Sequence, residues 1–270
     1  SPRLGSLCEE DHEIRDAIKH AGIFSIQDLV ALGVDADDVA RRLQLGPEAR
    51  IIFARVFAIA KARAAGNDEE RMGQTLDVLN GEGELIMRRT RADVHAHGFW
   101  HRAVHVWVVC TSTKRVLLGQ RALSKDMDPH RWTCVCGRVP SGELSMNTAV
   151  ARLGIEFSLQ ATPDYQGPKG LPIFMVFSMK CPKPITRGIF ADQHDCAWVD
   201  VYLATLEEEI PMERLHLDVR AKQASKYASL AELRRAYEVK DENYVIPPND
   251  EYIKKLLHYL AKTCEAGGPP

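Results

Sequence analysis

Short strand-like segments between residues 75 and 201 constrain the fold of this chain more than any other feature. These segments are rich in β-branched and aromatic residues, and turn-forming residues separate them. The six segments are TLDVLN, ELIMRRT, AVHVWVVC, RVLLGQR, IFMVFSMK and CAWVDV. Helical patterns interrupt or follow these segments near 144–157, 203–209, 219–237 and 249–263. This mixture predicts an α/β domain with helices on both faces of a mixed sheet.

The first part of the chain has a different pattern. Residues 1–66 carry apolar side chains at helical spacing without strand-like alternation, and Pro47 stands at the first position of the longest helical pattern. The polar stretch GNDEER predicts a linker at 67–74, and EAGGPP predicts a frayed tail at 265–270. We therefore expect a small all-α domain, a linker, and an α/β domain over 75–264.

Composition excludes several classes of protein. A formal net charge of −2 argues against a broadly basic protein that coats nucleic acid. The seven cysteines lack the spacing of a metal or disulfide framework, which indicates a reducing compartment. The longest apolar run, Ala103–Cys110, is too short to span a membrane, and no signal peptide is recognisable. We expect an intracellular protein without a membrane span, in mitochondria or another organelle, or alternatively in the cytoplasm.

The stretch RWTCVCGRVPSGELSMNTAVARLGIEFSL, residues 131–159, combines a glycine-rich turn with a helical pattern. Gly137 is followed six residues later by Glu143, and the helical pattern begins directly afterwards. Its apolar positions predict a buried stripe, whereas Glu156 is the one acidic residue within it.

Four segments together resemble the Nudix superfamily and, within it, isopentenyl-diphosphate isomerase and related hydrolases. They are HGFWHRAVHVWVV, VLLGQRALSKDMDPHRWT, VCGRVPSGE and ENYVIPPNDEYIKKLLHYL, and the resemblance covers most of 75–262. It implies a Nudix-type α/β/α sandwich with a mixed sheet. It also implies cleavage of diphosphates with Mg²⁺, which glutamates of the motif G-x5-E-x7-R-E-U-x-E-E-x-G-U would hold.

The departures from this motif fall on its charged positions. Ala151 stands where the motif has arginine, and Arg152 and Ile155 stand where it has glutamate. A cation at Arg152 would repel a magnesium ion where a ligand is expected. The pattern predicts a pseudoenzyme of the Nudix type, in which Glu143 and Glu156 are vestigial metal ligands and no cofactor is bound.

The isomerase subtype implies a catalytic cysteine and glutamate, with a metal held by histidines and glutamates. Cys136 matches the cysteine, and His95 and His101 match metal histidines. However, Arg138 replaces a further histidine, and the stretch KGLPIFMVF has no acid where a glutamate pair is expected. We interpret Cys136, His95 and His101 as vestigial. We expect Cys136 to be a small core residue, because nothing near it in the sequence would lower its thiol pKa.

The segment AIKHAGIFSIQDLVALGVDADDVARRLQLGPEARIIFARVFAIA resembles a SAM-like helical bundle. An L-x-L step precedes LGP-x-x-R at the start of the long last helix, as in that fold. The resemblance implies binding to other proteins and, in some cases, to RNA hairpins. The alternative is an unrelated helical bundle that packs on the second domain.

Three functions remain open from the sequence. The first is a structural or accessory subunit of a larger complex, such as an organellar ribonucleoprotein, with other proteins and RNA as its partners. The second is a phosphate- or RNA-binding module in which Arg131, Arg138 and Arg152 replace the metal. The alternative for these arginines is that they form structural ion pairs.

The third function is a metal-dependent Nudix hydrolase with a rewired site, acting on a nucleoside diphosphate or an RNA end. Its Mg²⁺ ligands would come from Asp126, Asp128 or the loop FADQHDC. That loop contributes Asp192, His194 and Asp195, which would act together with Glu143.

Overall fold

The computed structural model describes residues 16, 36–47, 49–50, 53, 73–122, 125, 128–162, 170–185, 193–218, 221–247 and 249–268. Helix α3 (Ala36–Arg42) lies in the region that the sequence predicts to be helical. Most of the predicted SAM-like bundle, and all of the predicted linker except 73–74, lie outside the described residues. The bundle and the domain boundaries therefore stay predictions.

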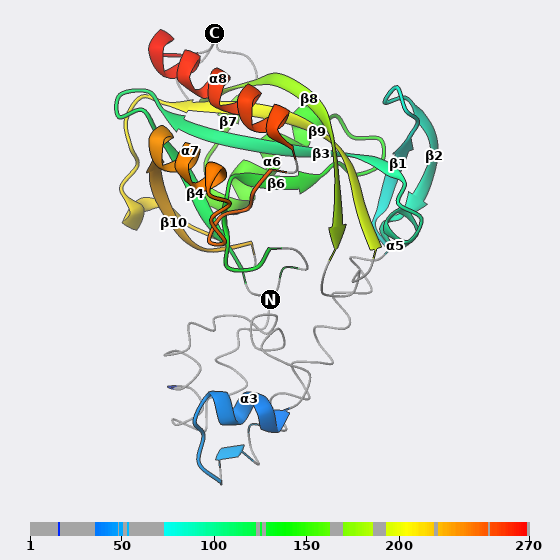
Figure 1. Ribbon diagram of the computed structural model, residues 1–270, viewed down its shortest axis with the longest axis vertical. Helices are drawn as coiled ribbons and strands as arrows, with labels where there is room; N and C mark the ends of the chain where they lie inside the picture. The colour runs from blue at the N-terminus through cyan, green and yellow to red at the C-terminus, as the bar shows by residue number, and fades with distance from the viewer. Residues whose placement is uncertain are drawn as a thin grey trace.

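The α/β part of the chain is built on one mixed sheet of ten described strands (Figure 1). The strands are β1 (Thr75–Leu79), β2 (Leu85–Thr90), β3 (Trp100–Cys110), β4 (Arg115–Arg121), β5 (Trp132–Thr133), β6 (Val135–Arg138), β7 (Ala161–Thr162), β8 (Leu171–Ile185), β9 (Gln193–Leu206) and β10 (Lys222–Ser229). All six strand-like segments of the sequence form strands, which confirms that part of the prediction.

Strands β3 and β9 form the centre of the sheet. They run parallel from the pair His101–Ala197 to the pair Cys110–Leu206, without a shift in register. The main path of the sheet is β10-β4-β3-β9-β8-β7, and β1 and β6 also pair with β3. A central parallel pair of this kind needs cover on both faces.

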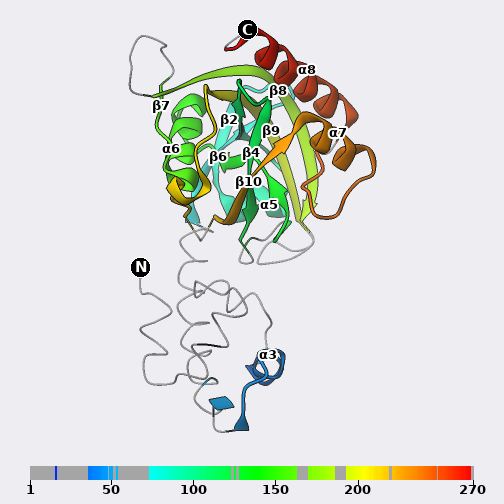
Figure 2. The ribbon, with the colours of Figure 1, turned by 90° about the vertical axis from the view of Figure 1, so that its left-hand side faces the viewer.

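Helices cover both faces of the sheet, as predicted. The helices of this part are α5 (Arg91–Ala96), α6 (Ser145–Phe157), α7 (Leu230–Glu238) and α8 (Asp250–Ala266), with a 3₁₀ turn, η2, at Met212–Arg214. Figure 2 shows α6 on one side of the strands and α7 and α8 on the other. No helix in the described ranges is long and apolar enough to cross a membrane.

The alternation of side chains along β3 connects the two halves of the core. Ala103, Trp107 and Val109 pack in the cluster that includes side chains of α7 and α8. Val104 and Val106 pack in the cluster that includes side chains of α6. Because successive residues of a strand point to opposite faces, His101 and His105 share the face of Ala103, as expected for a strand without a bulge.

Three details of the prediction are wrong. The pattern at 203–209 begins as the end of β9, so residues 204–206 form buried strand and not helix. The pattern at 219–237 contains strand β10 before the helix begins at Leu230. Leu144, expected in the buried stripe of α6, is 70% exposed at the N-cap position. In the first two segments, pairing with neighbouring strands overrides the helical spacing.

Candidate functional site

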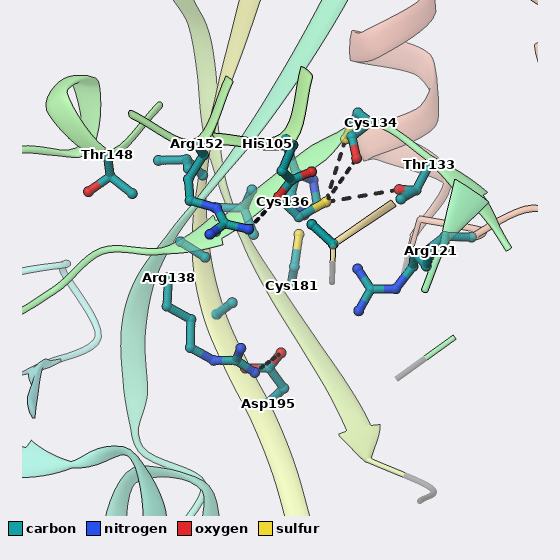
Figure 3. Close-up of a pocket in the computed structure, with 18 of the residues that line it drawn as sticks. His105, Arg121, Thr133, Cys134, Cys136, Arg138, Thr148, Arg152, Cys181 and Asp195 are labelled. Atoms are coloured by element: carbon teal, nitrogen blue, oxygen red, sulfur yellow. Dashed lines mark hydrogen bonds and ion pairs between the residues drawn. The ribbon is translucent and has the colours of Figure 1, made fainter. Parts of the chain in front are cut away.

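A cavity of about 530 Å³ lies beside the central strands. Its lining includes side chains of β3, β6, α6, β8, β9, β10 and α8. Trp107, Ala197, Val199 and Ile246 contribute an apolar wall. Figure 3 shows that the labelled polar side chains around this space come from different segments of the chain.

Cationic side chains dominate the charged lining of the cavity. The lining contains seven of them, namely Arg91, Arg121, Lys125, Arg138, Arg152, Lys183 and Lys222. It contains four carboxylates, namely Asp128, Glu143, Glu156 and Asp195. A cleft in which one sign of charge prevails attracts ligands of the opposite sign.

Glu156, the acid of the Nudix-like motif that α6 retains, forms ion pairs with two cations. Nη2 of Arg152 lies 2.5 Å from Oε1 of Glu156, and Nζ of Lys222 lies 3.4 Å from Oε2. Glu156 and Lys222 are each 2% exposed. Lys222 also donates a hydrogen bond of 2.8 Å to the carbonyl oxygen of Cys134. The position that would hold Mg²⁺ is therefore occupied by a buried cluster of ion pairs.

Two glycines make room for these cations. A Cβ atom on Gly137 would lie 2.6 Å from Cγ of Arg152, and a Cβ atom on Gly119 would lie 2.6 Å from Cδ of Lys222. Gly137, which the glycine-rich pattern places in a turn, lies inside β6 and gives space to the arginine. Gly142 has a φ of +79°, which agrees with its expected role in the tight turn before α6.

The described residues do not fit the magnesium ion that the resemblance implies. Magnesium needs several oxygen ligands in near-octahedral geometry, and Glu156 already serves two cations. Glu143 is exposed, and its Oε2 accepts a hydrogen bond of 3.3 Å from Thr148. Across the described ranges, no three side chains of His, Cys, Asp or Glu are grouped so that they could share a metal ion.

The histidines that match metal ligands form a second buried cluster around Asp195. Nε2 of His101 and Nδ1 of His95 lie 3.0 Å and 3.8 Å from Oδ1 of Asp195. Arg138, which replaces a metal histidine, lies 3.3 Å from Oδ2 of Asp195 (Figure 3). The structure thus brings these four predicted residues together, with a guanidinium rather than a metal ion beside the carboxylate.

This cluster fixes the protonation of two of its members. Burial lowers the pKa of His95 to about 3, and the charge of Arg138 acts in the same direction. Burial alone would raise the pKa of Asp195, but Arg138 and the hydrogen bond with His101 lower that pKa well below its ordinary value. The cluster therefore holds a neutral His95 beside an ionised Asp195 at neutral pH.

The other two histidines of the segment have structural contacts. His97 is exposed, and its Nδ1 lies 2.9 Å from the carbonyl oxygen of Asp93. Nδ1 of His105 lies 2.7 Å from the hydroxyl of Tyr252, which also accepts a hydrogen bond of 3.2 Å from Trp107. These contacts attach α5 and α8 locally and form no ligand set.

The environment of Cys136 corrects the prediction made for it. Its Sγ lies 3.7 Å from Sγ of Cys134 and 3.9 Å from the hydroxyl of Thr133 (Figure 3). The largest effect on the pKa of Cys136 is the hydrogen bond from Cys134, which lowers it. Burial acts in the opposite direction, but the neighbouring His105 also lowers the pKa, which lies well below its ordinary value. The C-x-C spacing was a local signal for the effect of Cys134, which sequence reasoning did not use, whereas His105 and Lys222 are distant along the chain.

The three predicted phosphate-binding arginines all form ion pairs in the structure. Arg138 and Arg152 line the cavity, whereas Arg131 pairs with Asp128 at 3.3 Å and is not part of the lining. Asp128 also pairs with Lys183, a cavity residue that the sequence did not single out. Nothing in the local sequence around Lys183 distinguishes it from an ordinary surface lysine.

The ligands expected for a rewired metal site are only partly described. Asp128 and Asp195 line the cavity together with Glu143, but both aspartates are paired with cations. His194 is exposed, and its carbonyl oxygen lies 3.2 Å from Nδ1 of His95. Asp126 and Asp192 lie outside the described residues, so their part in such a site stays a prediction.

Two curated relatives have significant similarity to the chain. Nudix hydrolase 3 of Arabidopsis thaliana is 31% identical over 193 residues, which cover 70% of this chain and 23% of that protein. An uncharacterized Nudix hydrolase of Clostridium acetobutylicum is 35% identical over 92 residues, which cover 33% of this chain and 44% of that protein. The chain therefore spans less than half the length of either relative. No family model matches it.

Solved structures with similar folds have low sequence identity to this chain. The protein DR0079 of Deinococcus radiodurans has a TM-score of 0.48 at 15% identity and covers 68% of this chain and 98% of its own. The dihydroneopterin triphosphate pyrophosphohydrolase of E. coli has a TM-score of 0.37 at 18% identity and covers 48% of this chain and 80% of its own.

The finer resemblances, to the isomerase subtype and to a SAM-like bundle, stay predictions. The sheet with its covering helices agrees with the fold that the motif implied, and Gly137 and Glu143 keep the spacing of that motif. Together with the two named relatives, these observations show that the chain belongs to the Nudix superfamily.

Proposed function

We propose that this chain is a catalytically inactive Nudix-fold protein whose cavity binds a phosphorylated ligand directly, without a divalent metal ion. One observation carries the proposal: Glu156, the acid retained on α6, is buried between Arg152 and Lys222. A carboxylate in two ion pairs is a poor ligand for Mg²⁺, because the metal would have to be placed next to both cations.

The charge of the lining supports an anionic ligand. Its cationic side chains outnumber its carboxylates by seven to four, so the lining carries an excess of positively charged groups. Arginine suits phosphate because its guanidinium offers two parallel N–H donors to two phosphate oxygens. Arg138 and Arg152 line the same cavity, and a phosphate could share their donors with Asp195 and Glu156.

The test measures binding of inorganic pyrophosphate to the full chain by titration calorimetry, with and without EDTA. We expect equal affinity in both conditions. Arg138→Gln should weaken binding by about tenfold or more, because it removes a charge-assisted hydrogen bond. Arg131→Gln is the matched control: it also breaks an arginine–aspartate pair, but Arg131 does not line the cavity.

Three results would overturn the proposal. Loss of pyrophosphate binding in EDTA would show that a metal ion mediates it. Mg²⁺-dependent hydrolysis of a nucleoside diphosphate that disappears in Glu156→Gln would show an active enzyme with a rewired site. Equal affinities of the Arg138→Gln and Arg131→Gln variants would remove the cavity as the binding site.

A second candidate function, an accessory subunit of a larger complex, has separate support from strand β2. Among the described strands, β2 pairs with β1 alone, and Leu85 and Ile86 on it are 52% and 54% exposed. An open strand edge with exposed apolar side chains is suited to pairing with another chain. Affinity purification at mild salt should recover stoichiometric partners, protein or RNA, and the variant Leu85→Lys, Ile86→Lys should lose them. A lone monomer from the unmodified chain would contradict this candidate.

A further inference from the structure

Two thiols lie together at the wall of the cavity. Sγ of Cys134 and Sγ of Cys136 are 3.7 Å apart (Figure 3). The C-x-C spacing produces this, because residues two apart in extended chain point to the same side. Both residues line the cavity, but they differ in exposure: Cys134 is 1% exposed, whereas Cys136 is half-buried.

Polar and cationic groups surround this pair. Lys222 donates to the carbonyl oxygen of Cys134, and the hydroxyl of Thr133 lies 3.9 Å from Sγ of Cys136. His105 lines the cavity with Cys136, and the two residues are register partners on β3 and β6. Reactive cysteines occur in electropositive, partly exposed surroundings of this kind, whereas structural cysteines sit in apolar ones.

We propose that Cys136 is a peroxide-reactive thiol and that Cys134 is its resolving partner. The thiolate of Cys136 attacks the terminal oxygen of a hydroperoxide, and the O–O bond breaks to give a sulfenic acid. The leaving oxygen takes up a proton from solvent and departs as water or an alcohol. The thiol of Cys134 then attacks the sulfenic sulfur, a second water leaves, and a disulfide forms. Both sulfurs are oxidised by one electron each, and the peroxide takes up the electron pair.

The protonation of the two thiols agrees with these separate roles. The hydrogen bond from Cys134 leads the effects that lower the pKa of Cys136. Burial raises the pKa of Cys134 well above its ordinary value. The first step requires a thiolate at Cys136, and a protonated thiol at Cys134 donates the hydrogen bond that favours this thiolate.

Other described cysteines offer an internal comparison. Cys181 also lines the cavity, but burial raises the pKa of its thiol to about 12. Cys196 is half-buried, as Cys136 is, yet burial and the charge of Asp195 raise its pKa. Cys196 is therefore the control, because it is a half-buried thiol without the surroundings of Cys136.

The first experiment uses the unmodified full chain. Alkylation by iodoacetamide at pH 7, followed by peptide mapping, should modify Cys136 about tenfold faster than Cys196, because the thiolate is the reacting form. One equivalent of hydrogen peroxide should then remove two hydrogen masses from the peptide that contains Cys134 and Cys136. A thiol reductant should restore both thiols.

The second experiment uses variants whose folding is checked by thermal unfolding. In Cys134→Ala, peroxide should leave a sulfenic acid on Cys136 that dimedone traps, whereas Cys136→Ser should give no trapped product at Cys134. In Cys196→Ser, disulfide formation should proceed as in the unmodified chain. Equal alkylation of Cys136 and Cys196 would overturn the proposal. Oxidation of Cys136 to sulfinic acid in the unmodified chain, without a disulfide, would overturn the role of Cys134.

Discussion

The guanidinium of Arg152 lies 2.5 Å from the carboxylate of Glu156, one turn further along α6. In the Nudix motif, both positions carry glutamate and serve a metal ion. Here Arg152 replaces one of these glutamates and pairs with the other, Glu156. Lys222 of β10 is a second cation beside Glu156. We propose that a site that would bind positive charge has become part of a cavity that binds negative charge.

Glu156→Gln should lower the free energy of unfolding by about 3 kcal/mol, because Lys222 is buried and would lose its carboxylate. Urea unfolding monitored by circular dichroism measures the change. The matched control is Glu251→Gln, which removes an exposed partner of Lys255 at the same helical spacing. The control should change stability by less than about 1 kcal/mol. Equal effects in the two variants would contradict a stabilising role for the buried cluster.

Gly119→Ala should destabilise the protein by about 2 kcal/mol, because the added Cβ would lie 2.6 Å from Cδ of the buried Lys222. Thermal unfolding of the variant measures the effect. Gly73→Ala is the control, since nothing lies within 4 Å of the Cβ position there. An unchanged melting temperature in Gly119→Ala would show that Lys222 moves aside at no cost.

Acidification should weaken the fold through His95. Its pKa is 6.5 in the unfolded chain and about 3 in the folded protein, where burial disfavours the charged form. Between these values the unfolded chain binds a proton that the folded protein does not. The free energy of unfolding therefore falls as the pH falls, by about 1.4 kcal/mol per pH unit for this one group.

Urea unfolding at several pH values between the two pKa values tests this dependence. His95→Gln should flatten the slope, whereas His97→Gln, on the same helix but exposed, should leave it unchanged. Asp195 also lowers the free energy of unfolding as the pH falls below 3.8, which is its pKa in the unfolded chain, because its pKa in the folded protein is lower. An unchanged slope in His95→Gln would mean that other groups carry the acid sensitivity.

Pyrophosphate binding should weaken steeply with ionic strength, because the proposed contacts are between charges near the protein surface. Raising the sodium chloride concentration by roughly tenfold should lower the affinity by more than removal of divalent ions does. Titration calorimetry at a series of salt concentrations measures the dependence. An affinity that is constant with salt but falls in EDTA would favour a metal-bridged complex.

Much of the fold was predictable because its signals are local. The strand-like segments alternate or run apolar at strand length, and α6 and α8 keep a helical stripe with Leu153 and Leu256 buried in it. The failures at 203–209 and 219–229 have one cause. Both segments pair with neighbouring strands that are remote in sequence, and such pairing is not encoded in local spacing.

The sequence by itself determined the superfamily, the six strand-like segments that form strands, and the loss of acids at Arg152 and Ile155. These follow from residue type and spacing. Only the tertiary structure decided what replaced the lost site, namely the pairing of Glu156 with Lys222 and the surroundings of the Cys134–Cys136 pair. The physical reason is that charge pairing and burial depend on distance in space, and the sheet brings β10, β6 and α6 to one cavity.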